Sequence, residues 1–145
     1  MEKLTLATDS HLVSVAEIER TVFHEPWSEN ALKLFLDDAN FCAVCARDDE
    51  VLSYCTVTSV LDEAQIVNIA TVKNSLRRGY ASQVLDFVIS ECEKRRINSI
   101  SLEVRVSNSA AIALYESKGF SKEGIRRSFY SHPREDAYVM IKEIN

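Results

Sequence analysis

The stretch from Ile66 to Val106 constrains the fold most, because it places a helix between two apolar strands. An apolar run from Ile66 to Val72 predicts the first strand, and Ile100 to Val106, with an apolar residue at every second position, predicts the other. Between them, apolar residues separated by 3, 4, 7, 8 and 11 positions predict a helix from about Gly79 to Arg95. The residues of this stripe are Ala81, Val84, Leu85, Val88, Ile89 and Cys92. Together these elements indicate a βαβ unit with a glycine turn before its helix.

The turn before this helix, Arg77-Arg78-Gly79-Tyr80-Ala81, predicts a binding site for phosphate. The first backbone N–H groups of a helix have no acceptor within the helix, and they lie at the positive end of its dipole. Both properties favour a phosphate group at this place. A glycine between a strand and a helix is equally compatible with a plain tight turn. The motifs G-x-G-x-x-G and G-x-x-x-x-G-K-[ST] are absent from the sequence.

Hydrophobic patterns in the rest of the 145 residues predict five more strands and three more helices, all in one domain spanning residues 1–145. The further strands are expected at about Leu4–Leu6, Phe41–Arg47, Val51–Val60, Phe120–Arg126 and Ala137–Ile141, and the further helices at about Leu12–Phe23, Ala31–Leu36 and Ser109–Lys118. The predicted order is therefore β-α-α-β-β-β-α-β-α-β-β, which belongs to the α/β class.

Several motifs resemble those of the Gcn5-related N-acetyltransferase (GNAT) superfamily. L-R-R-G-Y-A, from Leu76 to Ala81, is similar to the signature R/Q-x-x-G-x-G/A, with Leu76 in place of the usual Arg or Gln. The block from Glu103 to Phe120 resembles the RimI branch of this superfamily. Other segments that resemble this branch are Pro26-Trp27-Ser28-Glu29, Asn68-Ile69-Ala70 and Arg134-Glu135-Asp136-Ala137. The similarity extends over nearly the whole chain.

This resemblance implies the acyl-CoA N-acyltransferase (GNAT) fold, a mixed sheet with helices on both faces. It also implies an enzyme that transfers the acetyl group of acetyl-CoA to the N-terminal alanine of a small-subunit ribosomal protein, S18 in bacteria. Backbone groups near the end of the strand Ile66–Val72 are expected to contact the acetyl and pantetheine parts of acetyl-CoA. The amides of the turn before the helix are expected to hold its pyrophosphate. The implied cofactor-binding residues are Ile69, Ala70, Thr71, Arg77, Arg78, Gly79, Tyr80, Ala81, Ser82 and Asn108.

The acceptor amine determines which catalytic groups such a reaction needs. An α-amine has a pKa of about 7.7–8.0, so roughly one in ten is neutral at pH 7, whereas lysine, with a pKa of about 10.4, is almost fully charged. A single carboxylate acting directly or through water is then sufficient as general base. Glu103 lies on the polar face of its predicted strand and fits this role, although a glutamate there is also compatible with a solvent-facing position.

Tyr115 is the candidate general acid, because a phenol can give its proton to a departing thiolate. Its position in the pattern N-x-x-A-x-x-L-Y, which begins at Asn108, supports this assignment by the resemblance. A core tyrosine packed beside Leu114 is the alternative. Asn108 is expected to cap the helix, to contact CoA, or to do both.

The formal net charge of −5 disfavours a direct nucleic-acid partner and suits a basic peptide. The candidate acidic residues are Glu25, Asp37, Asp38, Asp62, Glu63, Glu135 and Asp136. No apolar run reaches 18 residues, and Met1-Glu2-Lys3-Leu4 lacks the pattern of a signal peptide, so a soluble, cytoplasmic protein without a membrane partner is expected.

No metal is expected. Cys42 and Cys45 have a metal-like spacing but lie in a predicted strand, where their thiols would point to opposite faces. The three histidines, His11, His24 and His132, show no metal-like clustering and are interpreted as surface or packing residues.

Two alternatives to the RimI-type function remain. One is an acetyltransferase of broader specificity, acting on other N-termini, on lysine or on a small amine. The other, from a different class, is a module that binds acyl-CoA without turnover, which the departure at Leu76 suggests. The presence of both Glu103 and Tyr115 favours an enzyme. The exact substrate residues and the oligomeric state do not follow from the sequence.

Overall fold

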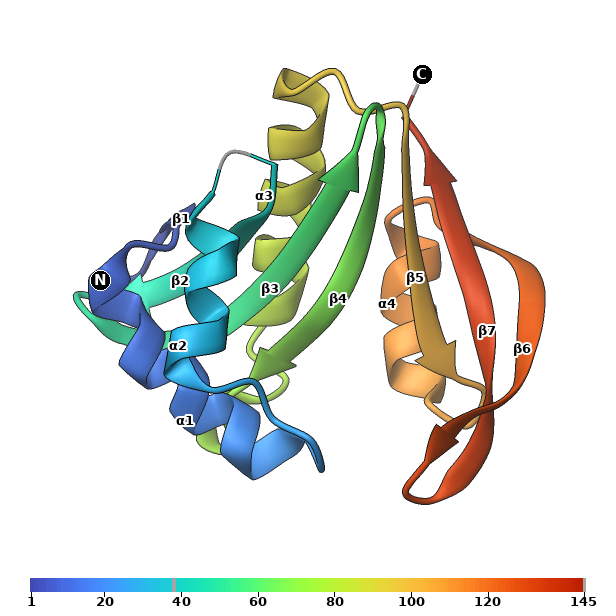
Figure 1. The fold of residues 1–145 in the computed structure, drawn as a ribbon, viewed down its shortest axis with the longest axis horizontal. Helices are drawn as coiled ribbons and strands as arrows, with labels where there is room; N and C mark the ends of the chain where they lie inside the picture. The colour runs from blue at the N-terminus through green and yellow to red at the C-terminus, as the bar shows by residue number, and fades with distance from the viewer. Residues whose placement is uncertain (38, 145) are drawn as a thin grey trace.

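One sheet of seven strands organises the computed structural model, which describes residues 1–37 and 39–144 (Figure 1). Within these residues the strand order is β1-β2-β3-β4-β5-β7-β6. Neighbouring strands are antiparallel except β4 and β5, which are parallel. The strands are β1 (Lys3–Leu6), β2 (Phe41–Arg47), β3 (Glu50–Val60), β4 (Glu63–Thr71), β5 (Ser99–Arg105), β6 (Ser121–Ser131) and β7 (Arg134–Glu143).

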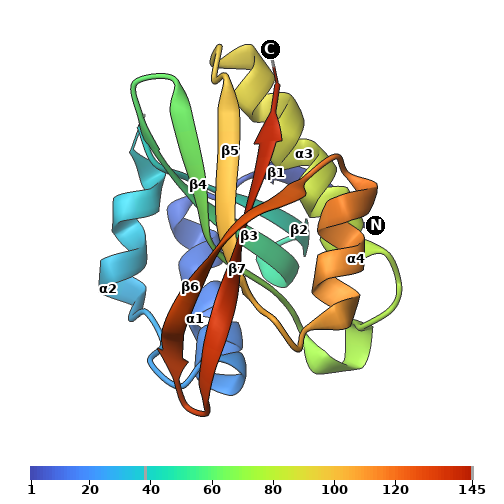
Figure 2. The same ribbon diagram turned by 90° about the vertical axis from the view of Figure 1, so that its right-hand side faces the viewer.

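Two pairs of helices cover the two faces of the sheet, as Figure 2 shows. The helices α1 (Leu12–Val22) and α2 (Glu29–Leu32) lie on one face, and α3 (Tyr80–Lys94) and α4 (Ser109–Ser117) lie on the other. Short 3-10 turns at Asp9–His11, Lys33–Leu36 and Lys73–Ser75 complete the elements of the described residues. The predicted order of strands and helices and the mixed sheet are confirmed. The predicted second helix is divided into α2 and the 3-10 turn that follows it.

Each face of the sheet has its own hydrophobic core. The core under α3 includes Val84, Leu85, Val88 and Cys92 of the predicted stripe, together with Ile100, Leu102 and Val104 of β5. The core under α1 and α2 includes Leu12, Val15, Leu32 and Phe35. Strand β2 lies between the two cores, so its side chains are buried on both faces. Cys42 packs in the α1 core and Cys45 in the α3 core, which confirms that the two thiols point in opposite directions.

The parallel pairing of β4 with β5 is short. Only Glu63–Gln65 and Ser99–Ser101 are in register, and the two strands then diverge, as Figure 1 shows. On its other side, β4 has a bulge, because Ile66 pairs with Val57 and Asn68 pairs with Thr56, which leaves Val67 without a partner on β3. The sheet is therefore split beyond Gln65, in the middle of the predicted βαβ unit.

Within the described part of the chain, no helix combines the length and the hydropathy that a membrane-crossing helix requires.

The burial of Cys42 predicts a specific loss of stability at alkaline pH. Burial raises the pKa of its thiol from 9.0 to about 12, so the unfolded chain loses this proton at a lower pH than the folded one. The stability that the thiol contributes is therefore complete below pH 9 and is lost between pH 9 and about 12. Cys42→Ser lacks this titration. The difference in unfolding free energy between wild type and Cys42→Ser should shrink between pH 7 and pH 10 in urea titrations, and a constant difference would contradict the argument.

Candidate active site

A cleft of about 770 Å³ opens where β4 and β5 diverge. Five segments line it: the stretch after α1, the middle of β4, the end of β5, one face of α4 with its cap and the tip of the β6–β7 hairpin. Of the predicted site residues, Ile69, Glu103, Asn108 and Tyr115 line this cleft. The structure thus brings together residues as far apart in the sequence as Ile69 and Tyr115.

Glu103 is held at the point of divergence by groups from two other strands. Its Oε1 accepts a hydrogen bond from Gln65 Nε2 at 3.0 Å, and its Oε2 forms an ion pair with Arg126 Nε at 3.2 Å. The side chain of Glu103 is only 14% exposed, so it is not the solvent-facing strand residue of the alternative interpretation. Each carboxylate oxygen has about two lone pairs. Both oxygens of Glu103 therefore retain capacity to accept a proton or a further hydrogen bond.

Tyr115 approaches the cleft from the opposite face of the sheet. It packs in the α3 core, where its ring lies 5.9 Å from that of Phe120. Glu103, in contrast, alternates with the buried Leu102 and Val104 and so faces the α1 side. Burial raises the pKa of the Tyr115 hydroxyl above its ordinary value, and the phenol therefore stays protonated throughout the neutral range. The cleft is thus bordered by a carboxylate, Glu103, on the α1 side of the sheet and by a protonated phenol, Tyr115, on the α3 side.

The turn before α3 contains two residues in the left-handed region of backbone conformation. Arg77 and Gly79 both have positive φ values, 64° and 81°, and Gly79 is the N-cap of α3. The first helical hydrogen bond runs from Gln83 N–H to Gly79 O at 3.1 Å, so the earlier amides of the turn have no acceptor within the helix. Arg77 and Arg78 are exposed beside them. The Tyr80 side chain turns inward, is 8% exposed and packs in the α3 core, so only its backbone faces the turn.

Asn108 caps α4. Its Oδ1 accepts a hydrogen bond from Ala111 N–H at 3.2 Å, which satisfies one of the free amides at the helix start. Asn108 is exposed and also lines the cleft. The prediction that it caps the helix is confirmed.

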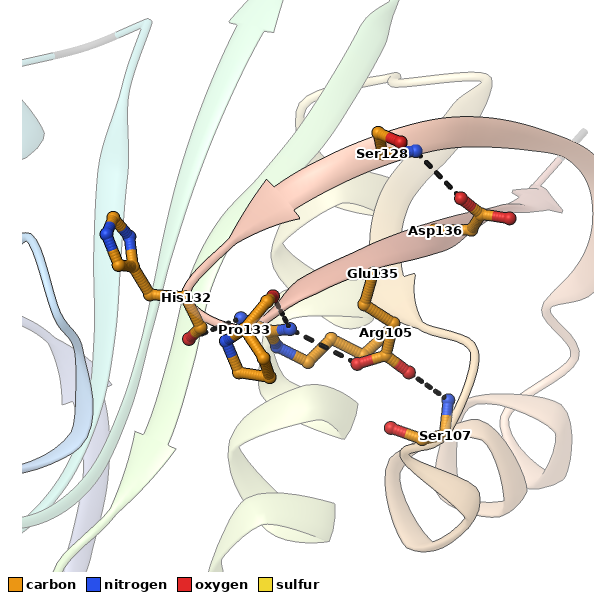
Figure 3. A network of polar contacts seen from close by, with 7 residues as sticks. All are labelled: Arg105, Ser107, Ser128, His132, Pro133, Glu135 and Asp136. Carbon is orange, nitrogen blue, oxygen red and sulfur yellow. Dashed lines mark hydrogen bonds and ion pairs between the residues drawn. The ribbon is translucent and has the colours of Figure 1, made fainter.

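Arg105 fastens the hairpin tip to the end of β5, as Figure 3 shows. Its guanidinium donates to the carbonyl oxygens of His132 and Pro133, at 3.1 and 2.9 Å, and forms an ion pair with Glu135 at 3.1 Å. Glu135 also accepts the backbone N–H of Ser107 at 2.8 Å. The hydrogen bond from Ser107, together with that from Arg105, holds the pKa of Glu135 below its ordinary value. The hairpin wall of the cleft is therefore fixed in place.

Two ring contacts complete this wall. The guanidinium of Arg105 lies over the ring of Tyr130 at 4.2 Å, and His132 stacks on His24 with 3.9 Å between ring centres. His24 belongs to the stretch between α1 and α2. The two walls of the cleft thus meet through the two histidines, which the sequence had indicated only as surface or packing residues.

Gln65, Arg105 and Arg126 were not predicted as site residues. The alternation of β5 places Arg105 on the same face as Glu103, and this signal was available in the sequence. Arg126 lies 23 positions beyond Glu103 on β6, and no local pattern links the two. Gln65 precedes the apolar run Ile66–Val72. Its hydrogen bond to Glu103 forms only because β4 pairs with β5 at Gln65 and Ser101.

The acidic residues considered for a basic peptide have diverse surroundings. Glu25 lines the cleft, whereas Asp62 accepts a hydrogen bond from Asn98 Nδ2 at 2.6 Å and lies away from it. Asp136 accepts the backbone N–H of Ser128 at 2.7 Å, which stabilises the irregular part of β6 (Figure 3). Asp38 lies outside the described residues.

Comparisons with known proteins agree with this geometry. The model of the acetyltransferase (GNAT) family matches residues 12–120. A ribosomal protein bS18-alanine N-acetyltransferase of Salmonella typhimurium is 35% identical over 147 aligned positions, covering 100% of this chain and 99% of that protein. The crystal structure of the ribosomal-protein-S18-alanine N-acetyltransferase from Escherichia coli has a TM-score of 0.90 at 34% identity, covering 100% of this chain and 95% of that one.

A more distant structural neighbour is the NatC complex bound to Gag peptide and CoA, with a TM-score of 0.84. At 19% identity over 99% of both chains, this likeness shows the fold alone.

Proposed function

This chain belongs to the acetyltransferase (GNAT) family, and we propose that it transfers the acetyl group of acetyl-CoA to the N-terminal alanine of ribosomal protein bS18. Its full-length similarity to enzymes named for this reaction supports the substrate. The main structural support is the single cleft bordered by Glu103 on one face of the sheet and Tyr115 on the other. We treat residues 1–145 as one catalytic domain.

The residues at the end of β4 and in the turn fit acetyl-CoA. Gly79 caps α3, and the first amides of a helix have no acceptor within it, so the amides from Arg77 to Ser82 are proposed to hold the pyrophosphate. Each hydrogen bond to such a charged group contributes roughly 1.5–3 kcal/mol. A Cβ added to Gly79 would meet no atom within 4 Å, so the turn is open to a ligand. Ile69, Ala70 and Thr71 lead from the cleft to this turn and would provide backbone groups for the pantetheine arm. Leu76 is exposed, and the proposed contacts use backbone amides, so they do not require the side chain of the usual Arg or Gln.

Glu103 is the proposed general base. When bound, acetyl-CoA supplies a thioester whose carbonyl carbon is attacked by the amine and whose sulfur departs as a thiolate. Glu103 accepts the proton of the amine, directly or through a water molecule, with the lone pairs that Gln65 and Arg126 do not occupy. Those two partners hold its carboxylate at the opening. The α-amine needs no stronger base, because its pKa lies near neutrality.

Tyr115 is the proposed donor to the departing sulfur. Its raised pKa keeps the proton on the phenol, so a hydrogen-bond donor is present at every pH at which the amine reacts. A phenol, with a pKa of about 10, is a weaker acid than a thiol, with a pKa of about 8.5. The hydroxyl of Tyr115 therefore stabilises the negative sulfur by donating a hydrogen bond, and solvent completes the protonation.

The turn is tested by two substitutions of Gly79. Gly79→Ala introduces only the strain of a side chain at a φ of 81°, whereas Gly79→Glu adds a negative charge at the pyrophosphate position. We expect Gly79→Glu to weaken acetyl-CoA binding at least tenfold beyond Gly79→Ala, a factor that corresponds to about 1.4 kcal/mol. Isothermal calorimetry of the two folded variants measures this ratio. Equal affinities would refute the location of the pyrophosphate.

The base is tested by Glu103→Gln, which retains the shape of the side chain. Turnover at pH 7 should fall by about 10²–10⁴, the usual contribution of a positioned acid or base. The loss should become smaller as the pH rises through the pKa of the α-amine, because more of the substrate is then neutral. Acetyl-CoA affinity should stay within about twofold of wild type. A wild-type rate at pH 7 would exclude Glu103 as the base.

Two controls accompany the pH profile. Glu50→Gln makes the same chemical change at an exposed position at the start of β3 and should keep the wild-type profile. Tyr115→Phe removes the donor but no group that titrates near neutrality, so its loss of rate should be the same at pH 7 and pH 9. A Tyr115→Phe loss that changed across this range would contradict the proposed role of the phenol.

The site of acetylation is tested with ribosomal protein bS18. After incubation with enzyme and acetyl-CoA, mass spectrometry should locate one acetyl group on the alanine amine. A peptide with the same sequence and a blocked N-terminus should not react. Acetylation confined to internal lysines would favour the alternative of a lysine-directed enzyme, and binding of acetyl-CoA without any transfer would favour the silent binding module.

A further inference from the structure

Glu19 is a buried acidic residue that the reaction described above does not use. It lies on the apolar face of α1 beside the buried Val15, Ala16 and Ile18, and it is 0% exposed. Burying such a group costs free energy unless hydrogen bonds replace those to water. The position therefore indicates that the side chain holds specific partners.

Three neutral donors from three different parts of the chain converge on the two oxygens of Glu19. The Trp27 backbone N–H donates to Oε1 at 2.9 Å, and Asn68 Nδ2 donates to Oε2 at 2.9 Å. The hydroxyl of Tyr54, on β3, donates to the same Oε2. Burial, and then the charge of Glu19, raises the pKa of Tyr54, so this hydroxyl stays protonated and remains a donor.

The bulge in β4 explains how Asn68 reaches this carboxylate. Ile66 and Ile69 pack toward the α3 core, whereas Val67 packs toward the α1 core. Strict alternation from Ile66 would direct residue 68 to the α3 side as well. Because Val67 has no partner on β3, the alternation shifts by one position, and Asn68 points to the α1 side.

Two of the three donors belong to the walls of the cleft. Trp27 and Asn68 both line it, the first from the stretch between α1 and α2 and the second from β4. Trp27 also packs edge-on against Phe35, with 5.3 Å between ring centres, and it precedes Ser28, which caps α2. The Glu19 carboxylate is thus hydrogen-bonded to two walls of the cleft on the α1 side of the sheet. Glu103 faces the cleft from this same side.

We propose that Glu19 is a positioning residue, which sets the distance between the Trp27 wall and the Asn68 wall and so shapes the part of the cleft that receives the acceptor peptide. The inference rests on the proposed function, because it assigns this side of the cleft to the peptide. Glu19 contacts no reacting atom in this proposal. Its loss should weaken use of the peptide and leave binding of acetyl-CoA, at the turn before α3, unchanged.

The experiment compares Glu19→Met with Glu17→Met. Methionine fills a similar volume but has no acceptor, so it leaves the three buried donors unpaired and lowers stability. Both variants are therefore measured at a temperature at which they are folded. Glu17 is exposed on the same helix and provides the matched control. We expect the KM for an alanine-starting bS18 peptide to rise about tenfold or more in Glu19→Met, since small displacements of positioning groups have effects of this size. The dissociation constant of acetyl-CoA should stay within about twofold of wild type, as in Glu17→Met.

A second measurement does not depend on catalysis. Trp27 is the only tryptophan of the chain, so its fluorescence reports the wall directly. Acrylamide should quench it more strongly in Glu19→Met than in wild type or Glu17→Met. If the wild type transfers no acetyl group to the peptide, the proposed function fails. The quenching experiment still tests whether Glu19 holds the Trp27 wall in place.

Glu19→Gln provides a graded variant and replaces Glu19→Met if the latter does not fold. A glutamine offers one oxygen in place of two, so its KM and its quenching should lie between those of wild type and Glu19→Met. A folded variant of Glu19 with the peptide KM and the Trp27 quenching of wild type would overturn the proposal. A loss of thermal stability alone, with both values unchanged, would assign Glu19 a purely structural role and would also overturn it.

Discussion

Hydrogen-bonded strands lie only about 4.8 Å apart, and a sheet paired along its whole length has no room for a ligand between its strands. In this protein β4 and β5 keep that spacing only over Glu63–Gln65 and Ser99–Ser101, and then diverge. The cleft, the access from both faces and the presence of Glu103 and Tyr115 in one lining all depend on this divergence. Beyond Gln65, the facing edges of β4 and β5 also offer backbone groups that no longer pair with each other.

Side-chain contacts fix the strands in place where they diverge. Gln65 and Arg126 hold Glu103 two residues beyond Ser101, the last residue of β5 that pairs with β4, and Arg105 ties the end of β5 to the hairpin tip. On the other side, the bulge at Val67 interrupts the regular pairing of β4 with β3. The site is therefore built from side-chain contacts between strands that a regular ladder would have joined through their backbones.

The sequence predicted those features that follow from local periodicity. The stripe of α3, the alternation of β5 and the polar face of Glu103 are properties of short segments, and the structure has them where they were expected. Hydrophobic patterns also predicted the order of elements and the turn before α3, and the resemblance supplied the expected cofactor and the expected roles of Glu103 and Tyr115. The split between β4 and β5 could not be predicted, because an apolar run such as Ile66 to Val72 indicates a strand without indicating its neighbours. Contacts between distant residues, such as that of Glu103 with Arg126 or of Glu19 with Asn68, were missed for the same reason.

The edge strand β6 bears on how the molecule avoids association with other molecules. Strand β6 is an edge strand, and its residues are exposed except for the half-buried Tyr130. Such an edge can template the addition of a strand from another molecule and so promote aggregation. Two features counter this here: charged side chains recur along the strand, and the register with β7 shifts twice, with Ser128 at a φ of 52° in the second irregular stretch. The same irregularity that shapes the hairpin wall therefore also protects the molecule from edge-to-edge association.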